Sequence, residues 1–215
     1  MAIANDLEVH LLALSLAGRR PVILDAHEYS PCEFEDKLVW RLTRQGFSQH
    51  LSSRYLNRAA AMITACDGIA LEYRRNFAVE PAVVPNAAPF HDLPLRTTSP
   101  VQIRLIHHGG AIASRRIEEM IDMMDLVDEH FSLDLILVPG DPLYIARIRQ
   151  RAAGNLKVCF LDPVPMNKLV ELSAGYDVGL FLLPPTNLNY AMAAPTSSLS
   201  SSRRALRWRL ALHQR

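Results

Sequence analysis

Cysteine is scarce in this 215-residue sequence. Cys32, Cys66 and Cys159 are the only three, they lie far apart, and no CxxC pair occurs. This pattern excludes a disulfide framework and a zinc knuckle, and it predicts reduced thiols. The zinc-protease spacing is missing too, since the position four residues after His27 is Pro31 and not a second histidine. We therefore expect no metal site and no zinc protease.

An excess of charge and a long apolar run are also lacking. The chain carries 23 basic and 22 acidic residues, a net charge of +1. This balance gives no reason to expect nucleic acid or an anionic membrane as partner, although peripheral membrane contact stays open. No run is apolar enough to span a bilayer, and the N-terminus lacks the basic start of a signal peptide. We expect a cytoplasmic protein.

Apolar residues make up 49% of the chain, and they recur in an α/β pattern. Asn5 with Glu8 resembles a capping box and predicts a helix to Ala17. Buried strands and helices then alternate, which is typical of a parallel sheet. The expected elements are a strand at Val22–Leu24, helices over 33–45 and up to Tyr55, a strand MITAC, a helix from Asp67 as N-cap, and a strand AVVPN. No strand is expected before the first helix.

The segment 91–100 is rich in proline and threonine and predicts a linker between two domains. After it, strands and helices alternate as β-α-β-α-β-α-β, like the first half of a Rossmann-like domain. Ile117, Met120, Ile121 and Met124 mark the buried face of one of these helices. We expect an α/β fold of two incomplete Rossmann-like domains, 1–90 and 101–192, followed by an aberrant or disordered tail, 193–215.

Ligands of open α/β sheets bind beyond the carboxyl ends of the strands. His27 and Glu28 stand at such a place, just after Asp25. They suit acid–base or hydroxyl-binding work, but from residue type alone a turn capped by Asp25 with an ordinary loop histidine is the better explanation. The turns at Pro139–Asp141 and at Leu183–Pro185, with Asn187, Asn189 and Tyr190 beyond the latter, are better explained by simple turn chemistry.

A second place is the turn His107-His108-Gly109-Gly110, followed by Arg115 and Arg116 at a helix start. Glycines let a phosphate approach backbone N–H groups, and arginines hold its charge. Because arginine at a helix N-terminus opposes the helix dipole, its presence indicates an anion. An ordinary glycine turn with exposed arginines is the equal alternative. The pattern is not GxGxxG, so NAD is disfavoured.

Together these segments resemble the family-4-type glycosyltransferases of the two-Rossmann GT-B fold. The resemblance covers the chain to about Met192. It rests on the strand end with Asp25, His27 and Glu28, and on the runs RAAAMITACDGIALEYRRNF, VVPNAAPF, RLIHHGG…SRRIEEMI, NLKVCFLDPVPMNKLVELSAGYDVGLFLLPP and NLNYAM.

The resemblance implies transfer of a sugar from a nucleotide-diphosphate sugar to a hydroxyl acceptor, in polysaccharide or glycoconjugate biosynthesis. The first domain would hold the acceptor, a glycan or small molecule, with His27 and Glu28 facing it. The second would hold the donor, and no metal or other cofactor would be needed. Its implied donor-binding residues are Gly109, Gly110, Arg115, Arg116, Phe160, Val164 and Pro165.

The sequence departs from this family at both ends. The first strands of the acceptor domain are missing before Met1, and a Ser/Arg-rich tail stands where a lysine and a glutamate are expected. A one-base shift at the codon of Pro195 can recode the next residues as Asn-Lys-Phe-Phe-Glu-Phe-Ile-Gln-Ala-Arg. Our hypothesis is that the tail from Thr196 is out of frame and that the enzyme is truncated and impaired. The alternative is a native disordered tail.

Two other functions stay open from the sequence. One is a non-catalytic module that binds a nucleotide or sugar. The other is a sugar-nucleotide epimerase of the two-Rossmann type.

Overall fold

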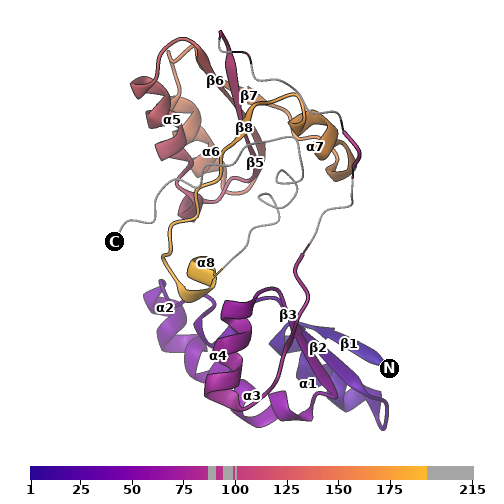
Figure 1. Cartoon of the computed structure of the whole chain (residues 1–215). Coiled ribbons are helices and arrows are strands. Elements are labelled where there is room, and N and C mark those ends of the chain that lie inside the picture. The colour runs from indigo at the N-terminus through magenta and orange to yellow at the C-terminus, as the bar shows by residue number, and fades with distance from the viewer. Residues whose placement is uncertain (87–90, 94–98, 100, 193–215) are drawn as a thin grey trace. The chain divides into compact units, whose positions relative to one another are not determined.

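The computed structural model describes residues 1–86, 91–93, 99 and 101–192. The described residues form two compact units: unit 1 comprises Met1–Asn86 with 185–192, and unit 2 comprises the described residues between 91 and 184 (Figure 1). Most of the expected linker 91–100 and the tail from residue 193 lie outside the described residues. The unit boundary at Pro185 differs from the expected end of the second domain at 192, since residues 185–192 group with unit 1.

Unit 1 is built on a four-stranded parallel sheet of order β1-β2-β3-β4. Its core includes Leu7, Leu24, Ile69 and Tyr73. The elements of this unit before β4 are β1 (Ala2–Asn5), α1 (Leu7–Ala17), β2 (Val22–Ala26), α2 (Leu38–Trp40), a π-helical turn (Arg41–Gln45), α3 (Gly46–Tyr55), β3 (Ala61–Thr64) and α4 (Asp67–Phe77). Strand β4 (Ala82–Val83) is an edge strand of the sheet. Helix α8 (Leu188–Met192), although more than 100 residues later in sequence, also belongs to unit 1.

The expected capping box at Asn5 is wrong. Residues Ala2–Asn5 form strand β1, which pairs in parallel with Val22–Asp25, and α1 begins only at Leu7. The first unit therefore does start on a strand. The N-cap position of α1 is Asp6, whose side chain makes no capping hydrogen bond. The sequence pattern missed β1 because four residues are too few to show a period.

Two other helix starts differ from the sequence expectation. The helix expected from residue 33 begins at Leu38. The side chains of Glu35 and Asp36, just before it, instead bond to the segment around α8, through Leu188 N and Asn187 Nδ2. Asp67 is the first residue of α4 and not its N-cap, which is Cys66.

Unit 2 holds a second parallel sheet, of order β7-β6-β5-β8. The predicted alternation of strands and helices is confirmed. The elements are β5 (Ile103–Gly110), α5 (Ile117–Leu126), β6 (Phe131–Val138), α6 (Pro142–Arg151), β7 (Val158–Leu161), α7 (Met166–Ser173) and β8 (Val178–Gly179). The last strand is much shorter than the apolar run YDVGLFLLP indicated.

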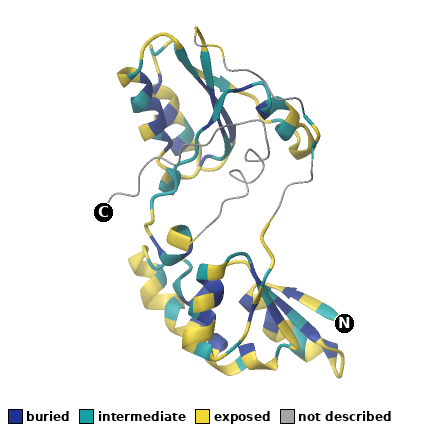
Figure 2. Cartoon of the chain, viewed as in Figure 1, coloured by how far each residue is buried: buried dark blue, intermediate teal, exposed yellow. Residues whose placement is uncertain are grey.

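The predicted face of α5 is confirmed, because Ile117, Met120, Ile121 and Met124 are all buried. This buried side of α5 faces the sheet in Figure 2. Asp141 caps α6 by accepting a hydrogen bond from Leu143 N at 2.9 Å, so simple turn chemistry does account for that turn.

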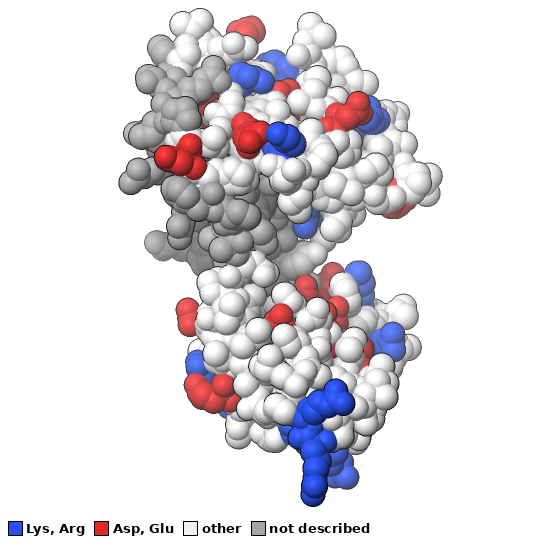
Figure 3. All heavy atoms as spheres, turned by 90° about the vertical axis from the view of Figure 1, so that its right-hand side faces the viewer, with Lys and Arg blue, Asp and Glu red and all other residues white. Residues whose placement is uncertain are grey.

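The three cysteines are free thiols. On the face drawn in Figure 3, acidic and basic side chains are spread over each unit, in keeping with the net charge of +1. No helix among the described residues is long and apolar enough to cross a membrane.

Candidate functional site

A turn at the carboxyl end of β5 forms the first candidate site. Gly109 has a φ of +147°, a conformation that side chains rarely adopt. A Cβ at this position would lie 2.6 Å from Nη1 of Arg115. Gly109 thus allows the Arg115 guanidinium to lie directly against the strand end. The sequence prediction that Gly109 and Arg115 belong to one site is consistent with this contact.

The side chain of Arg115 has a hydrogen-bond donor with no acceptor among the described residues. Its Nε is buried and has no partner among the described residues. The guanidinium also lies over the ring of Phe181, with Cζ 5.5 Å from the ring centroid. Because a buried donor without an acceptor is costly, this arrangement favours an anionic or carbonyl ligand at the turn.

The two histidines of β5 are held neutral. Burial lowers the pKa of His107 to about 4, and His107 Nδ1 donates to Leu180 O at 2.9 Å. Burial and then the charge of Arg115 lower the pKa of His108. The ring of His107 is wholly buried, and its Nε2 has no partner among the described residues. Arg115 is therefore the positive charge of this turn at neutral pH.

Arg116 differs from Arg115. It is exposed, and its Nη1 pairs with Oε1 of Glu119 at 2.7 Å. The first turn of α5 already carries Glu118 and Glu119, and Ile117 N donates to the hydroxyl of Tyr144 at 3.2 Å. Since this helix end has its own negative charges and acceptor, Arg115 with the glycine turn is a better candidate for anion binding than the helix dipole.

The three residues expected at the nucleotide base lie near the end of β7. Phe160 is half-buried at the edge of the unit 2 core, with the Arg149 guanidinium 4.8 Å above its ring. Val164 is half-buried and Pro165 is exposed, immediately before α7. Strand β6 separates β7 from β5 in the sheet.

The second candidate site lies in unit 1, where β1 and β2 end. Asp6, Glu8, His27, Glu28, Ser30 and Glu33 line a cleft of about 170 Å³. His27 Nε2 lies 3.2 Å from Oδ2 of Asp25, so this carboxylate can fix the orientation of the imidazole. Burial and the nearby Asp6 raise the pKa of Glu28. The structure thus brings His27 and Glu28 into one cleft; that they face an acceptor stays a prediction.

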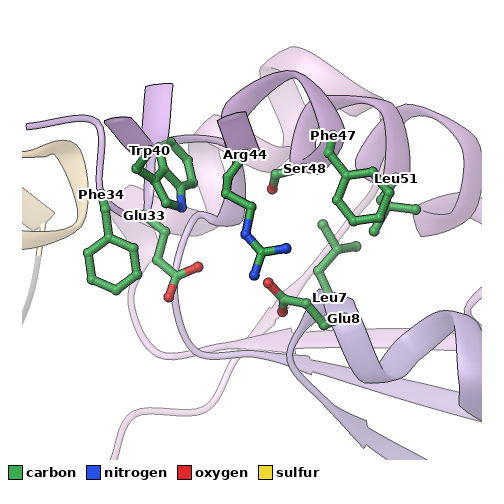
Figure 4. A pocket seen from close by; sticks show the side chains of 9 residues that line it. All are labelled: Leu7, Glu8, Glu33, Phe34, Trp40, Arg44, Phe47, Ser48 and Leu51. Atoms are coloured by element: carbon green, nitrogen blue, oxygen red, sulfur yellow. The ribbon is translucent and has the colours of Figure 1, made fainter. Parts of the chain in front are cut away.

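A second, larger cleft of about 250 Å³ adjoins the first, because Glu8 and Glu33 line both. Figure 4 shows its Arg44 guanidinium pointing into the hollow between the carboxylates of Glu8 and Glu33. Burial and the neighbouring Glu28, Glu8 and Asp6 raise the pKa of Glu33 to about 7, while Arg44 lowers it. The remaining wall is formed by Leu7, Phe34, Trp40, Phe47, Ser48 and Leu51.

The loop that carries His27 and Glu28 is held by buried hydrogen bonds. The Tyr73 hydroxyl donates to Glu28 O at 2.9 Å and accepts from Ser30 N at 3.1 Å. Asn189 of α8 accepts from Tyr29 N at 2.6 Å and donates to Tyr29 O at 3.3 Å. A segment 160 residues away in sequence therefore fixes the backbone beside Glu28.

Sequence reasoning missed several of these residues. Asp6 and Glu33 fall inside predicted helices, so nothing in the sequence indicated that they line a cleft. Asn189 was noted as a turn residue, but no local pattern could show that it meets Tyr29. Arg44 and Tyr73 gave no signal, because their importance depends on tertiary contacts alone.

No protein-family model matches the sequence, and no curated protein matches it. Solved structures do match. TarM of S. aureus, solved with UDP, fondaparinux and α-GlcNAc-glycerol, matches at a TM-score of 0.64 and 12% identity over 83% of this chain and 36% of its own. HepE of Anabaena, solved with UDP-glucose, matches at a TM-score of 0.60 and 16% identity, over 82% of this chain and 52% of its own.

A trehalose-phosphate synthase of the UDP-forming type from Burkholderia vietnamiensis matches at a TM-score of 0.56 and 12% identity, over 82% of this chain and 52% of its own. The chain has the GT-B fold. The fold expected from the sequence is thus confirmed. The chain spans about one third to one half of the length of these solved structures.

Proposed function

We propose that this chain is part of a glycosyltransferase that moves a sugar from a nucleotide-diphosphate sugar to a hydroxyl acceptor, in the cytoplasm, for polysaccharide or glycoconjugate biosynthesis. The observation that carries the proposal is the close approach of Arg115 to Gly109 at a strand end, together with a buried Arg115 Nε that has no partner among the described residues. Uridine diphosphate is the proposed nucleotide, because TarM and HepE of the same fold were solved with it or its sugar.

On the donor side, Arg115 would neutralise the diphosphate. Its charge acts where negative charge develops as the sugar departs, and its burial strengthens the interaction. Gly109 and Gly110 would let the phosphates come close to the backbone. Phe160, Val164 and Pro165 would line the base, and Arg116, which pairs with Glu119, would contribute less.

On the acceptor side, the unit 1 cleft offers two candidate bases. The raised pKa of Glu28 moves this carboxyl toward the range in which a group can take up a proton at neutral pH. His27 is an alternative base, oriented by Asp25. Either side chain would receive the proton of the acceptor hydroxyl while the glycosidic bond to the diphosphate breaks.

The direct test is release of UDP from a panel of UDP-sugars, with and without acceptor alcohols and glycans, by the full chain. Acceptor-dependent release supports the proposal, and it should fall at least tenfold in Arg115→Ala. Arg116→Ala is the matched control, since it removes the same charge one residue away. UDP release without acceptor would indicate the epimerase. Nucleotide binding with no turnover would indicate a binding module if the chain stays inactive after the one-base shift at the codon of Pro195 is repaired, and an impaired enzyme if the repaired chain turns over.

A further inference from the structure

The segment that follows β8 carries a phenylalanine that the core of unit 2 does not account for. Leu180 and Leu182 are among the half-buried residues that pack against this core. Phe181, which lies between them in sequence, does not belong to that set in the described part of the chain, although it is half-buried as well. Packing against the core therefore does not explain why an aromatic ring stands at this position.

The ring of Phe181 contacts two side chains of the first candidate site instead. Its centroid lies 6.0 Å from the centroid of the His107 ring, and the two ring planes are tilted by 34°. The Arg115 guanidinium lies over the Phe181 ring, with Cζ 5.5 Å from the centroid. A cation at this distance is attracted by the negative face of an aromatic ring. Phe181 thus connects the buried histidine of β5 with the charged group of the glycine turn.

The backbone that carries this ring is held by His107. Strand β8 spans only two residues and pairs with β5 (Figure 1). Just beyond it, Leu180 N donates to Ile106 O at 2.7 Å, and Leu180 O accepts from His107 Nδ1 at 2.9 Å. Because His107 is wholly buried in an inner strand of the sheet, the second bond fixes the backbone directly before Phe181.

The surroundings of Arg115 leave its positive charge available. No carboxylate of the described residues forms an ion pair with Arg115, whereas Arg116, Arg147 and Arg151 each pair with one. A carboxylate that held the guanidinium would also cancel its charge, but an aromatic ring attracts a cation without doing so. A side chain that is already ordered loses less entropy when a ligand binds. An aromatic support therefore suits an arginine that has to meet an anion.

We propose that Phe181 is a positioning residue of the diphosphate site. Its ring holds the Arg115 guanidinium at the Gly109 turn, and His107 fixes the segment that carries the ring. This inference rests on the proposed binding of a nucleotide diphosphate. It adds that the strength of this binding depends on the side chain at position 181. The competing explanation is that the ring only fills space, which an aliphatic side chain would do as well.

The experiment is calorimetric titration of the full chain with UDP and with uridine, read as the ratio of the two dissociation constants. Phe181→Leu keeps an apolar side chain but removes the ring, and it should lower the preference for UDP by about fivefold. Phe181→Tyr keeps the ring and should retain the preference. The affinity for uridine should be the same in both variants as in the wild type, since uridine has no phosphate for Arg115 to bind.

Matched variants separate this role from general packing. Phe131 is also a half-buried phenylalanine of unit 2, but it stands at the amino end of β6, so Phe131→Leu should keep the preference for UDP. In an Arg115→Ala background, Phe181→Leu should cause no further loss, because the ring then has no guanidinium to hold. His107→Leu removes the donor to Leu180 O and should lower the preference. His107→Asn offers a side-chain N–H donor and should retain most of it.

A second readout needs no nucleotide. Nitrogen-15 NMR relaxation of Arg115 Nε, assigned by its absence in Arg115→Ala, reports how firmly the guanidinium is held. We expect this group to be restrained in the wild type and in Phe181→Tyr, and more mobile in Phe181→Leu. Thermal unfolding checks that each variant is folded, and Phe181→Met takes the place of Phe181→Leu if the latter does not fold.

The outcomes distinguish this inference from the function on which it rests. A preference for UDP that depends on Arg115 but not on the ring at position 181 would overturn the inference and leave the diphosphate site standing. Equal mobility of Arg115 Nε in the three proteins would also overturn it, and so would a loss in Phe131→Leu as large as that in Phe181→Leu. Equal affinity of the wild type for UDP and uridine would overturn the diphosphate site itself and this inference with it.

Discussion

Asn189 makes two hydrogen bonds to the backbone of Tyr29, accepting from its N–H at 2.6 Å and donating to its carbonyl at 3.3 Å. Both residues are buried. This pairing ties the segment that follows β8 in sequence to the loop that carries His27 and Glu28. The geometry of the unit 1 cleft thus depends on a residue from the other end of the chain.

Substitution Asn189→Ala should destabilise unit 1 by about 1–3 kcal/mol, because it leaves the buried N–H and carbonyl of Tyr29 without partners. Urea unfolding followed by tyrosine fluorescence measures the change. Asn167→Ala, at an exposed position of α7, is the control and should have almost no effect. A loss for Asn189→Ala no greater than for the control would contradict the assigned role of this contact.

Gly109→Ala should lower the affinity for UDP for two reasons. The new Cβ would displace the Arg115 guanidinium, and alanine would have to adopt the positive φ of this position. The double variant with Arg115→Ala should bind UDP no more weakly than Arg115→Ala alone, because the displaced group is already gone. Calorimetric titration of the three variants checks this. Gly46→Ala, in unit 1 with no heavy atom within 4 Å of the new Cβ, is the control and should leave UDP binding unchanged. Strictly additive losses in the double variant would show that the two residues act separately.

His107 should make the protein sensitive to acid. Burial lowers its pKa from 6.5 to about 4, so the unfolded chain binds more protons than the folded one between these values. Its neutral form therefore contributes stability above pH 6.5 that is lost as the pH falls toward 4, on the order of 3 kcal/mol in total.

The variant His107→Asn should flatten this part of the stability profile, measured as the free energy of unfolding at several pH values between 7.5 and 4.5. His50→Asn, at an exposed position of α3, is the control and should keep the wild-type slope. If the slope survives in His107→Asn, another group is responsible.

Glu33 should carry a proton in part of the molecules at neutral pH, since burial and the nearby carboxylates raise its pKa to about 7. The pKa of Glu33 is higher in the folded than in the unfolded chain, so the folded state binds more protons. The stability that this provides at low pH is lost as the pH rises through about 7. Glu33→Gln should therefore raise the melting temperature more at pH 8 than at pH 5. Arg44→Gln should push the pKa of Glu33 higher still, as read by carbon-13 NMR titration; a fall would contradict the assigned cause.

The tail offers a prediction at the level of the gene. The out-of-frame hypothesis predicts that the codons after Pro195, shifted by one base, encode Lys and Glu in an amphipathic pattern and then an apolar strand. Sequencing from the codon of Asn187 past the stop tests this. Early stop codons in both other frames would defeat the hypothesis and make the tail native.

The sequence predicted the unit 2 fold well because its elements are long and regular. The four apolar residues of α5 recur with a clear helical period, and all four are buried. Strand β5 spans eight residues, which is long enough to be recognised from sequence. Unit 1 was harder, since β1 spans only four residues and shows no period, whereas β4 lies within the predicted strand AVVPN. Local patterns also could not reveal that Glu35 and Asp36 turn toward α8 instead of extending a helix.

The candidate sites were foreseeable only in part. Strand ends and glycine turns can be located from sequence, which gave His27, Glu28 and Gly109. The distinction between Arg115 and Arg116 could not be foreseen, because adjacent side chains on a turn differ only in their tertiary contacts. The same holds for Asn189, whose partner is 160 residues away.

The most direct test of the account is calorimetric titration of the full chain with UDP, compared with uridine, for the wild type, Arg115→Ala and Arg116→Ala. We predict that the wild type binds UDP more tightly than uridine, and that Arg115→Ala loses most of this difference, about tenfold or more. Arg116→Ala should retain it. Equal affinity for UDP and uridine in the wild type, or an equal loss in both variants, would contradict a diphosphate site at Gly109 and Arg115.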